Sequence, residues 1–295
     1  MQRNHKLPPF RGVATALVTP FREGKVDLES FREQVDFQLR GGVDALVVCG
    51  TTGEAPTLRP GERDALLSAA CEEADKTLPV IMGTGSNDTR TAVAAAKRAA
   101  KLGADALLAV TPYYNKGTKN GIVDHYLRIA ESVDLPLILY NVPGRTGVDL
   151  SVEQLARLAE HPNICAVKDA GGNIEKTADL CASIGERLAI YSGNDSQIVP
   201  ILSLGGLGVI SVLSNLLPQL TCRICERWFA GKSAESASLQ LRLLALIRLL
   251  FADVNPAPVK AAMAIMGRDS GELRLPLSEI SEDLKAKLYK ELEKI

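Results

Sequence analysis

Short runs of aliphatic residues alternate along this chain with longer segments in which apolar residues recur every three or four positions. Such runs, bounded by Gly, Pro, Asn or Asp, are typical of buried strands, and the longer spacing is typical of amphipathic helices. The runs lie at residues 13–20, 45–50, 80–85, 106–112, 137–142, 165–169, 188–193 and 208–213. Each is followed by a polar loop and a helical pattern, so the sequence predicts eight strand–helix units.

Alternation of strands and helices predicts parallel strands joined by helical crossovers. Eight units favour an α/β fold of the (β/α)8 TIM barrel type over an open doubly wound sheet. An internal repeat supports this prediction, because GVDALVV at 42–48 recurs as GADALLA at 103–109. Helix starts are predicted at Asp27 and Ser151, which have the side chains of N-caps, and the Ala-rich segment 91–101 favours a helix.

The alternation stops after Gly231. The segments that follow have helical spacing with no strand between them, at 233–251, 256–266 and 281–294. We therefore predict a barrel domain with the candidate site at residues 1–231 and a C-terminal helical domain at residues 232–295.

Composition narrows the class of protein. The chain has 295 residues, 46% of them hydrophobic, which is enough for one large core. A net charge of −1 gives no basis for binding nucleic acid or an anionic membrane. The most apolar stretch, 239–251, contains two arginines and is too short to span a bilayer, and residues 1–11 contain no apolar core of a signal peptide. A cytoplasmic protein is expected.

The six cysteines are scattered through apolar segments, which is typical of buried thiols in a reducing compartment. Cys222 and Cys225 form a C-x-x-C pair, the pattern of redox centres and of half a metal site. No second pair and no neighbouring His accompanies them. We favour a structural role for both.

Unusual polar residues collect where predicted strands end, and in this barrel catalytic groups lie at the carboxyl ends of the strands. The motifs at these ends are GTTGE (50–54), TPYYN (111–115), YNVPGRT (140–146), Lys168 and SGND (192–195). Their side chains are expected to converge at one mouth of the barrel.

Lys168 is the most informative of these residues. Strand side chains alternate between faces, so Lys168 shares a face with Ile164 and Ala166, which indicates the barrel interior. Burial lowers the pKa of a lysine and frees its amine, the nucleophile of Schiff-base chemistry. The alternative is a lysine that reaches solvent from the strand end.

Tyr140 lies on the preceding strand and is expected beside Lys168, where a phenol can transfer protons; an ordinary barrel tyrosine is the alternative. Thr51 and Thr52 have hydroxyls that either cap the next segment or bind a carboxylate. Arg145 follows a Pro-Gly turn and offers a planar fork to a carboxylate, or is an exposed structural arginine.

The sequence lacks the residues that a metal site or a nucleotide-binding loop would need at the strand ends. The histidines at 5, 125 and 161 lie in the N-terminal arm or in predicted helices, away from the strand ends, so no metal site is expected at the mouth. There is no P-loop and no strand-coupled G-x-G-x-x-G.

With these motifs, together with GVIS (208–211) and NPAPVK (255–260), the sequence resembles the dihydrodipicolinate synthase / N-acetylneuraminate lyase family of class I aldolases from Gly12 to the C-terminus. The resemblance implies that Lys168 forms an imine with pyruvate and that Tyr140, hydrogen-bonded to Thr51, shuttles protons. It implies that Tyr114 completes the proton relay from a neighbouring subunit.

The resemblance also implies the partners of the reaction. The enamine would attack the aldehyde of L-aspartate 4-semialdehyde, a step of diaminopimelate and lysine biosynthesis catalysed by a lyase. Arg145 would bind the semialdehyde carboxylate and Thr52 the pyruvate carboxylate, while Gly193 and Ile210 would line the pocket, Ile210 through its carbonyl. No metal or organic cofactor is implied, and a homotetramer built as a dimer of dimers is expected.

Two alternatives stay open at this point. The first is another pyruvate-releasing aldolase of the family, acting on a 2-keto-3-deoxy sugar acid or on 4-hydroxy-2-oxoglutarate with the same lysine. Sialic acid is disfavoured, because relatives that cleave it usually have Ser at the position of Thr52 and lack Arg145. The second alternative is a barrel that only binds metabolites or partners.

The resemblance extends to feedback by lysine, which inhibited members bind through His and Glu at a dimer interface. The matching positions here are Arg63 and Thr91, with Ala55 in place of a Ser. An added cation and a missing carboxylate disfavour a cationic ligand, so we predict weak or absent inhibition by lysine.

Overall fold

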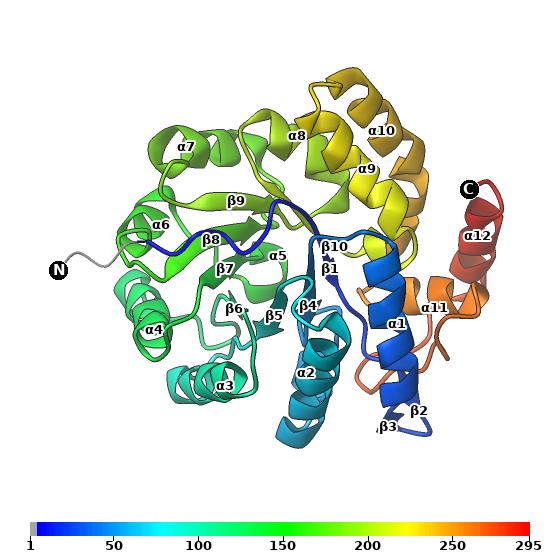
Figure 1. Ribbon diagram of the computed structural model, residues 1–295, viewed down its shortest axis with the longest axis horizontal. Coiled ribbons are helices and arrows are strands. Elements are labelled where there is room, and N and C mark those ends of the chain that lie inside the picture. Colours follow the sequence, from blue (N-terminus) through cyan, green and yellow to red (C-terminus); the bar gives the residue numbers. More distant parts are fainter. Residues whose placement is uncertain (1–4) are drawn as a thin grey trace.

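The computed structural model describes residues 5–295 and contains a closed barrel of parallel strands (Figure 1). Strands that follow one another in the chain lie side by side, and the first strand closes the barrel by pairing with the second and the last. The barrel strands are β1 (Gly12–Ala16), β4 (Ala45–Val48), β5 (Val80–Gly83), β6 (Ala106–Val110), β7 (Leu137–Asn141), β8 (Ile164–Asp169), β9 (Ala189–Ser192) and β10 (Gly208–Ser211). The predicted TIM barrel is confirmed.

Seven of the eight predicted runs extend past the carboxyl end of their strand. The reason is that the loops at this end are themselves buried: Leu17 and Val18 follow β1, Val142 follows β7 and Val212 follows β10, all less than one-tenth exposed. Apolar residues therefore continue where strand pairing has ended. A hairpin of β2 (Phe21–Arg22) and β3 (Lys25–Val26) after β1 was not predicted.

Helices surround the strands, as Figure 1 shows. They are α1 (Leu28–Arg40), α2 (Pro60–Ala74), α3 (Thr89–Lys101), α4 (Lys119–Glu131), α5 (Pro143–Thr146), α6 (Val152–Leu158), α7 (Ile174–Ile184), α8 (Ile198–Ser203) and α9 (Pro218–Phe229), with 3-10 turns η1 (Ala55–Thr57), η2 (Asp195–Gln197) and η3 (Leu213–Asn215).

Both predicted helix N-caps are confirmed. Asp27 Oδ1 accepts from the backbone N–H of Ser30 at 3.1 Å, and Ser151 forms a reciprocal capping box with Gln154. Helix α3 begins two residues before the predicted segment, because Asp88 caps it.

Alternation along the strands separates two apolar layers. Ile138 and Ala166 belong to the cluster inside the barrel, while Leu139 and Val167 belong to the cluster between strands and helices. Position 168 falls on the interior side with Ala166. Ile164 was predicted to share this face, and that placement is wrong, because the register of β7 and β8 shifts between Ile164 and Ala166 and Ile164 joins the outer cluster.

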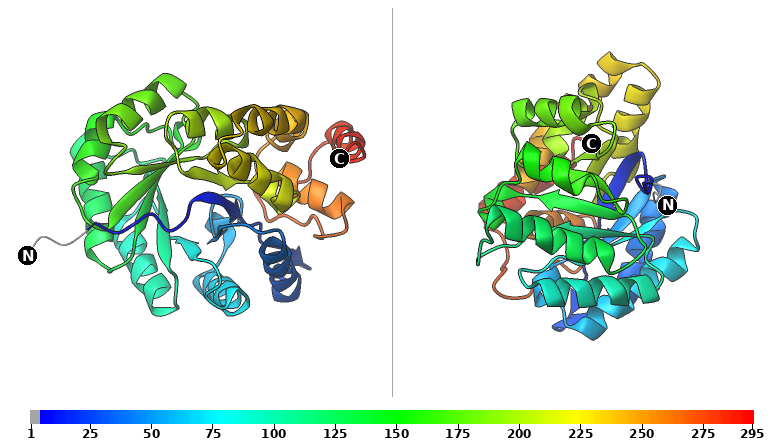
Figure 2. Two further views of the ribbon diagram at one scale, coloured as in Figure 1. Left: turned by 45° about the horizontal axis from the view of Figure 1, so that its top comes forward. Right: turned by 90° about the vertical axis from the view of Figure 1, so that its left-hand side faces the viewer.

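The C-terminal extension consists of helices, as predicted. They are α10 (Ser233–Leu250), α11 (Ala257–Ile265) and α12 (Glu282–Leu292). Helix α10 packs against α9, and Figure 2 shows α11 and α12 standing together at one side of the barrel. The boundary at residue 231 falls between α9 and α10, and the division into two domains stays a prediction.

The amino-terminal end of the barrel is closed. The segment before β1 crosses this end, where Lys6 N–H donates to the Pro162 carbonyl at 2.7 Å. The Phe10 ring stacks on Tyr191 with centroids 4.2 Å apart. The open mouth is therefore at the carboxyl ends of the strands. Across residues 5–295, no helix has both the length and the apolar composition needed to cross a membrane.

Candidate active site

Lys168 lies one residue before the end of β8, with its side chain inside the barrel. Its exposed fraction is 6%, and its Nζ lies 4.3 Å from the centroid of the Tyr140 ring. Burial lowers the pKa of Lys168 to about 8; Asp195 opposes this shift and Arg145 adds to it. More of this amine is therefore neutral near pH 7 than in an ordinary lysine, and a neutral amine is a nucleophile.

Tyr140 is the direct neighbour of Lys168 in the barrel, since the two residues pair in register between β7 and β8. Burial raises the pKa of Tyr140, whereas the charge of Arg145 and a hydrogen bond with the Thr51 side chain lower it. Thr51 reaches Tyr140 from the turn after β4. A protonated phenol thus lies between a hydroxyl and an amine, an arrangement suited to proton transfer.

Asp195 is a buried carboxylate close enough to interact with Lys168, and sequence reasoning gave it no role. Its Oδ1 accepts from Ser211 Oγ at 2.5 Å, and its Oδ2 accepts from the backbone N–H groups of Val212 and Leu213, both at 3.0 Å. Burial raises the pKa of Asp195, and these hydrogen bonds and Lys168 oppose the shift. In the sequence, Asp195 could have been identified as the acidic residue of the SGND motif, which lies at the end of a predicted strand.

Thr52 and Arg145 come together through Asn255, which lies before α11. Asn255 Nδ2 donates to Thr52 Oγ1 at 3.0 Å, and the Asn255 carbonyl accepts from Arg145 Nη2 at 3.3 Å. Thr52 is 3% exposed, so its hydroxyl is held in a dry site. The C-terminal segment therefore contacts two candidate carboxylate-binding groups, which the position of Asn255 in the sequence did not indicate.

The GTTGE loop is anchored by a buried ion pair. Lys260 Nζ lies 2.9 Å from Glu54 Oε1, both side chains are fully buried, and Lys260 also donates to the Thr19 carbonyl at 2.8 Å. Glu54 has a left-handed backbone, with φ of 53°, that is uncommon outside glycine. The ion pair fixes Glu54, and with it the turn that carries Thr51 and Thr52. The NPAPVK motif was its sequence signal.

Gly193 directly follows β9, and Ile210 lies on β10. A Cβ at Gly193 would approach Ala170 Cβ to 2.7 Å, so the backbone can pass here only without a side chain. Ile210 is fully buried inside the barrel, in the same cluster as Tyr140. A contact of the Ile210 carbonyl with a ligand stays a prediction.

Tyr114 is the one predicted catalytic residue that this chain does not bury near the others. Its side chain is 89% exposed and its φ is 69°, whereas the adjacent Tyr113 lines the pocket described next. A role for Tyr114 in the relay therefore requires another subunit.

A cavity of about 400 Å³ opens at the mouth of the barrel. Its lining includes Thr51, Tyr140 and Arg145 as well as Ala55, Arg63 and Thr91. The positions compared with the feedback site thus border the same cavity as Thr51 and Tyr140, two of the candidate catalytic residues. Arg63 donates a hydrogen bond to the Gly83 carbonyl, which holds its guanidinium at the cavity wall.

The remaining titratable groups of interest lie elsewhere. Cys222 and Cys225 are buried thiols in α9, neither forms a disulfide, and burial raises the pKa of Cys222 to about 12. His161 lies in the turn after α6, so its predicted placement in a helix is wrong. Within residues 5–295, no group of three His, Cys, Asp or Glu side chains is arranged to hold a metal ion.

The fold and this site define the class: a (β/α)8-barrel enzyme of the class I aldolase type, with Lys168 near the end of β8 as its candidate reactive group. The model of the dihydrodipicolinate synthetase family matches residues 9–295, and the chain belongs to this family.

Relatives agree along nearly the whole chain. A 4-hydroxy-tetrahydrodipicolinate synthase of Geotalea daltonii is 46% identical over 279 residues, 95% of this chain and 96% of the relative. The crystal structure of dihydrodipicolinate synthase from Thermotoga maritima superimposes with a TM-score of 0.96 at 43% identity, covering 97% of this chain and 99% of that one. The crystal structure of the chloride-inhibited dihydrodipicolinate synthase from Acinetobacter baumannii, complexed with pyruvate, superimposes with a TM-score of 0.94 at 42% identity. The match covers 96% of this chain and 98% of that one.

Proposed function

We propose that this chain condenses pyruvate, held as an imine on Lys168, with L-aspartate 4-semialdehyde, the reaction of the 4-hydroxy-tetrahydrodipicolinate synthases to which it is similar. The observation that carries the proposal is the Lys168 amine, which is buried, has a lowered pKa and lies against Tyr140. The reaction belongs to the diaminopimelate route to lysine.

The chemistry follows from these groups. The neutral amine adds to C2 of pyruvate, and the carbinolamine loses one water when Tyr140 supplies a proton to the departing hydroxyl. Loss of a methyl proton gives an enamine, whose carbon attacks the aldehyde of the second substrate. The amino group of that substrate then attacks the imine carbon, closes the ring and releases Lys168. The nitrogen of the lysine supplies the electron sink, so the proposal needs no metal or organic cofactor.

Binding of both substrates requires sites for two carboxylates. We assign the pyruvate carboxylate to Thr52 with neighbouring backbone N–H groups, and the semialdehyde carboxylate to Arg145, whose guanidinium lines the cavity. Gly193 and Ile210 would line the pocket near Lys168.

Tyr114 would complete the proton relay in another subunit, which fits its 89% exposed side chain. The proposal therefore includes a homo-oligomer, expected as a dimer of dimers, and a cytoplasmic location where both metabolites are available.

The second candidate is another pyruvate-releasing aldolase acting on a sugar acid or a hydroxy-oxoglutarate. It would use the same lysine and tyrosine. Arg145 in the cavity wall favours an aldehyde that carries a carboxylate, and the identity of the relatives favours the synthase.

Borohydride trapping with pyruvate tests the imine. Wild type should gain one stable pyruvate adduct on Lys168, located by mass spectrometry of a digest. Lys168→Ala should gain none, whereas Lys101→Ala, which removes an exposed lysine of α3, should be labelled as wild type is. An unlabelled wild-type protein would refute the proposal and leave a barrel that only binds metabolites. Turnover of aspartate semialdehyde, measured against cleavage of sugar acids, separates the two candidate functions.

A further inference from the structure

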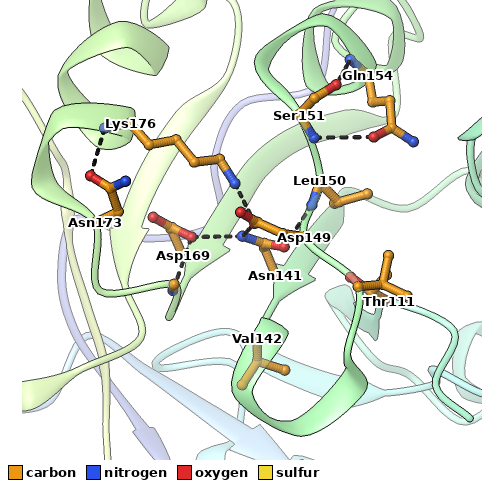
Figure 3. Close-up of polar contacts among 12 residues, drawn as sticks. Thr111, Asn141, Val142, Asp149, Leu150, Ser151, Gln154, Asp169, Asn173 and Lys176 are labelled. Carbon is orange, nitrogen blue, oxygen red and sulfur yellow. Dashed lines mark hydrogen bonds and ion pairs between the residues drawn. The ribbon is translucent and has the colours of Figure 1, made fainter.

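A network of polar side chains with a buried centre lies where β7 and β8 end (Figure 3). Its centre is Asn141, the last residue of β7, whose Nδ2 donates to Asp169 Oδ1 at 2.9 Å and to Asp149 Oδ1 at 2.8 Å. Asn141 is 1% exposed and Asp169 is 3% exposed. Asp149 in turn forms an ion pair with Lys176 of α7.

The register of the sheet places this network next to the candidate catalytic pair. Tyr140 pairs with Lys168 and Asn141 pairs with Asp169, so each network residue directly follows a reactive one. Successive side chains of a strand point to opposite faces, so Tyr140 and Lys168 face the barrel interior and the second pair faces the helices. The Asn141–Asp169 hydrogen bond therefore fixes the distance between β7 and β8 at the point where the amine and the phenol meet.

Hydrogen bonding in the network is complete at its centre. Asn141 Oδ1 accepts from the backbone N–H of Leu150 at 3.0 Å, so both of its donors and its acceptor are used. Asp169 Oδ2 accepts from Thr177 Oγ1 at 3.2 Å, and its Oδ1 also accepts from Gly171 N–H at 3.2 Å. A buried network with these bonds satisfied is rigid, and replacing one member leaves its partners unpaired.

The requirement comes from the reaction. Imine formation on Lys168 needs protons to move to and from the oxygen of the carbinolamine. Such proton transfer is sensitive to displacements below 1 Å. The backbone ladder alone ends here, since Ala170 N–H donates to Asn141 O at 2.9 Å and the chain then turns away. The Asn141–Asp169 side-chain bond adds a second link between the two strand ends at the place of this last backbone bond.

We propose that Asn141 and Asp169 are positioning residues, which hold the Lys168 amine and the Tyr140 phenol at the separation that imine formation needs. The inference rests on the proposed function of Lys168. It concerns residues that touch neither substrate, because both face away from the cavity.

Asn141→Asp tests the inference with a side chain of the same shape. The variant loses both N–H donors and places a carboxylate between Asp149 and Asp169. We expect the single-turnover rate of imine formation with pyruvate, trapped by borohydride at pH 8, to fall by about 10- to 100-fold. The KM for pyruvate should change by less than about threefold, since the groups that bind its carboxylate are untouched.

The pH dependence separates positioning from simple loss of stability. At low pH the crowded carboxylates of the variant take up a proton, and a protonated carboxyl donates one hydrogen bond again. The ratio of variant rate to wild-type rate should therefore rise between pH 9 and pH 6. The double variant Asn141→Asp/Asp169→Asn exchanges the hydrogen-bond donor and acceptor between the two positions. Because one amide again faces one carboxylate, the double variant should recover a large part of the rate that Asn141→Asp loses.

Asn163→Asp is the matched control at the other end of the same two strands. Asn163 is 3% exposed and its Nδ2 donates to the carbonyls of Ala130 and Val133, at 3.0 and 2.9 Å. This variant should unfold at lower temperature, with an imine rate per folded molecule within about twofold of wild type and no trend of the ratio with pH.

The outcomes are distinct. If wild type forms no adduct, the proposed function fails. If wild type forms the adduct and Asn141→Asp matches its rate at every pH, or Asn163→Asp loses the same rate, the positioning role is wrong while the proposed function stands. Should Asn141→Asp fail to fold, Thr177→Val removes one donor to Asp169 at nearly constant volume. Its rate should fall by about two- to fivefold, and an unchanged rate would refute the positioning role.

Discussion

The two ends of the barrel use polar side chains in different ways. At the amino-terminal end, Asp44 and Asp105 accept from the backbone N–H groups of Val13 and Val80, at 2.7 and 2.8 Å. At the carboxyl end, the Lys168 amine donates no hydrogen bond to any residue among 5–295 and lies against an aromatic ring. Side chains at the amino-terminal end accept hydrogen bonds from backbone N–H groups of the sheet. At the carboxyl end, the Lys168 amine has no such bond within the described part of the chain and is free to react with a ligand.

The two ends differ in how their polar side chains affect the free energy of the folded state. A carboxylate that accepts a hydrogen bond from a strand N–H lowers the free energy of the folded state. A buried amine with a lowered pKa raises it, because the folded state must either desolvate the charge or give up the proton. Functional sites are where such conflicts are expected, and the surrounding network compensates for them.

The largest effect expected from this contrast comes from removing one phenolic hydroxyl at each end. Tyr140→Phe should lower kcat by about 10²- to 10³-fold, because the proton donor beside Lys168 is lost. Tyr191→Phe, which removes the hydrogen bond to the Phe10 carbonyl at the closed end, should lower kcat by less than about threefold. Steady-state kinetics of both variants decides the matter, and equal losses would mean that the two ends are not functionally distinct.

The pH dependence follows from the lowered pKa of Lys168, about 8 against an ordinary 10.5. The rate of imine formation should rise about tenfold per pH unit below pH 8 and level off above it, as the amine loses its proton. Stopped trapping with borohydride across pH 6 to 10 measures this profile. A plateau that begins only above pH 10 would show that burial does not free the amine.

The same shift has a consequence for stability. Between pH 8 and 10.5 the unfolded chain binds a proton at this lysine that the folded chain does not, so its contribution to stability rises with pH in that window and is least favourable below it. Lys168→Met should therefore be more stable than wild type at pH 7, by on the order of 3 kcal/mol, with the difference closing toward pH 10.5. Denaturant melts at several pH values test this, and Lys168→Met equal to or weaker than wild type at pH 7 would contradict it.

Phe10→Ala should act on stability alone. The ring stacks on Tyr191 and is 7% exposed, so its removal should cost about 3 kcal/mol of unfolding free energy. The kcat of the folded variant should stay within about twofold of wild type, because the closed end takes no part in the reaction. A large loss of kcat without loss of stability would reverse the roles given to the two ends.

The smallest effect is expected from added lysine. Arg63 and Thr91 at the cavity present a cation and no carboxylate, so millimolar L-lysine should change the rate by less than about twofold. Strong inhibition in a titration at fixed substrate would refute this prediction. Arg63→His/Thr91→Glu should then restore sensitivity if charge at these positions is what excludes lysine.

The sequence alone determined the fold and the list of candidate residues. Aliphatic runs alternating with helical spacing predicted the eight strands, because strand and helix periodicities are local properties of the chain. Alternation along one strand placed Lys168 on the interior side with Ala166, and the pairing of successive strands placed Tyr140 beside it. The ends of the strands were less certain, since buried loop residues such as Val142 continue the apolar pattern.

The tertiary structure decided what surrounds these residues. The Glu54–Lys260 ion pair joins residues 206 positions apart, and the Asn255–Thr52 hydrogen bond joins residues 203 apart. No local periodicity encodes such contacts. The exposure of Tyr114, the carboxylate of Asp195 near the amine and the Asn141–Asp169 link likewise depend on how separate elements pack. Hydrophobic periodicity is a property of a segment, so the sequence determined the barrel and the place of Lys168 on the interior side of its strand. Burial and charge depend on how the strands and helices pack, so only the tertiary structure decided the pKa of Lys168 and the contacts around it.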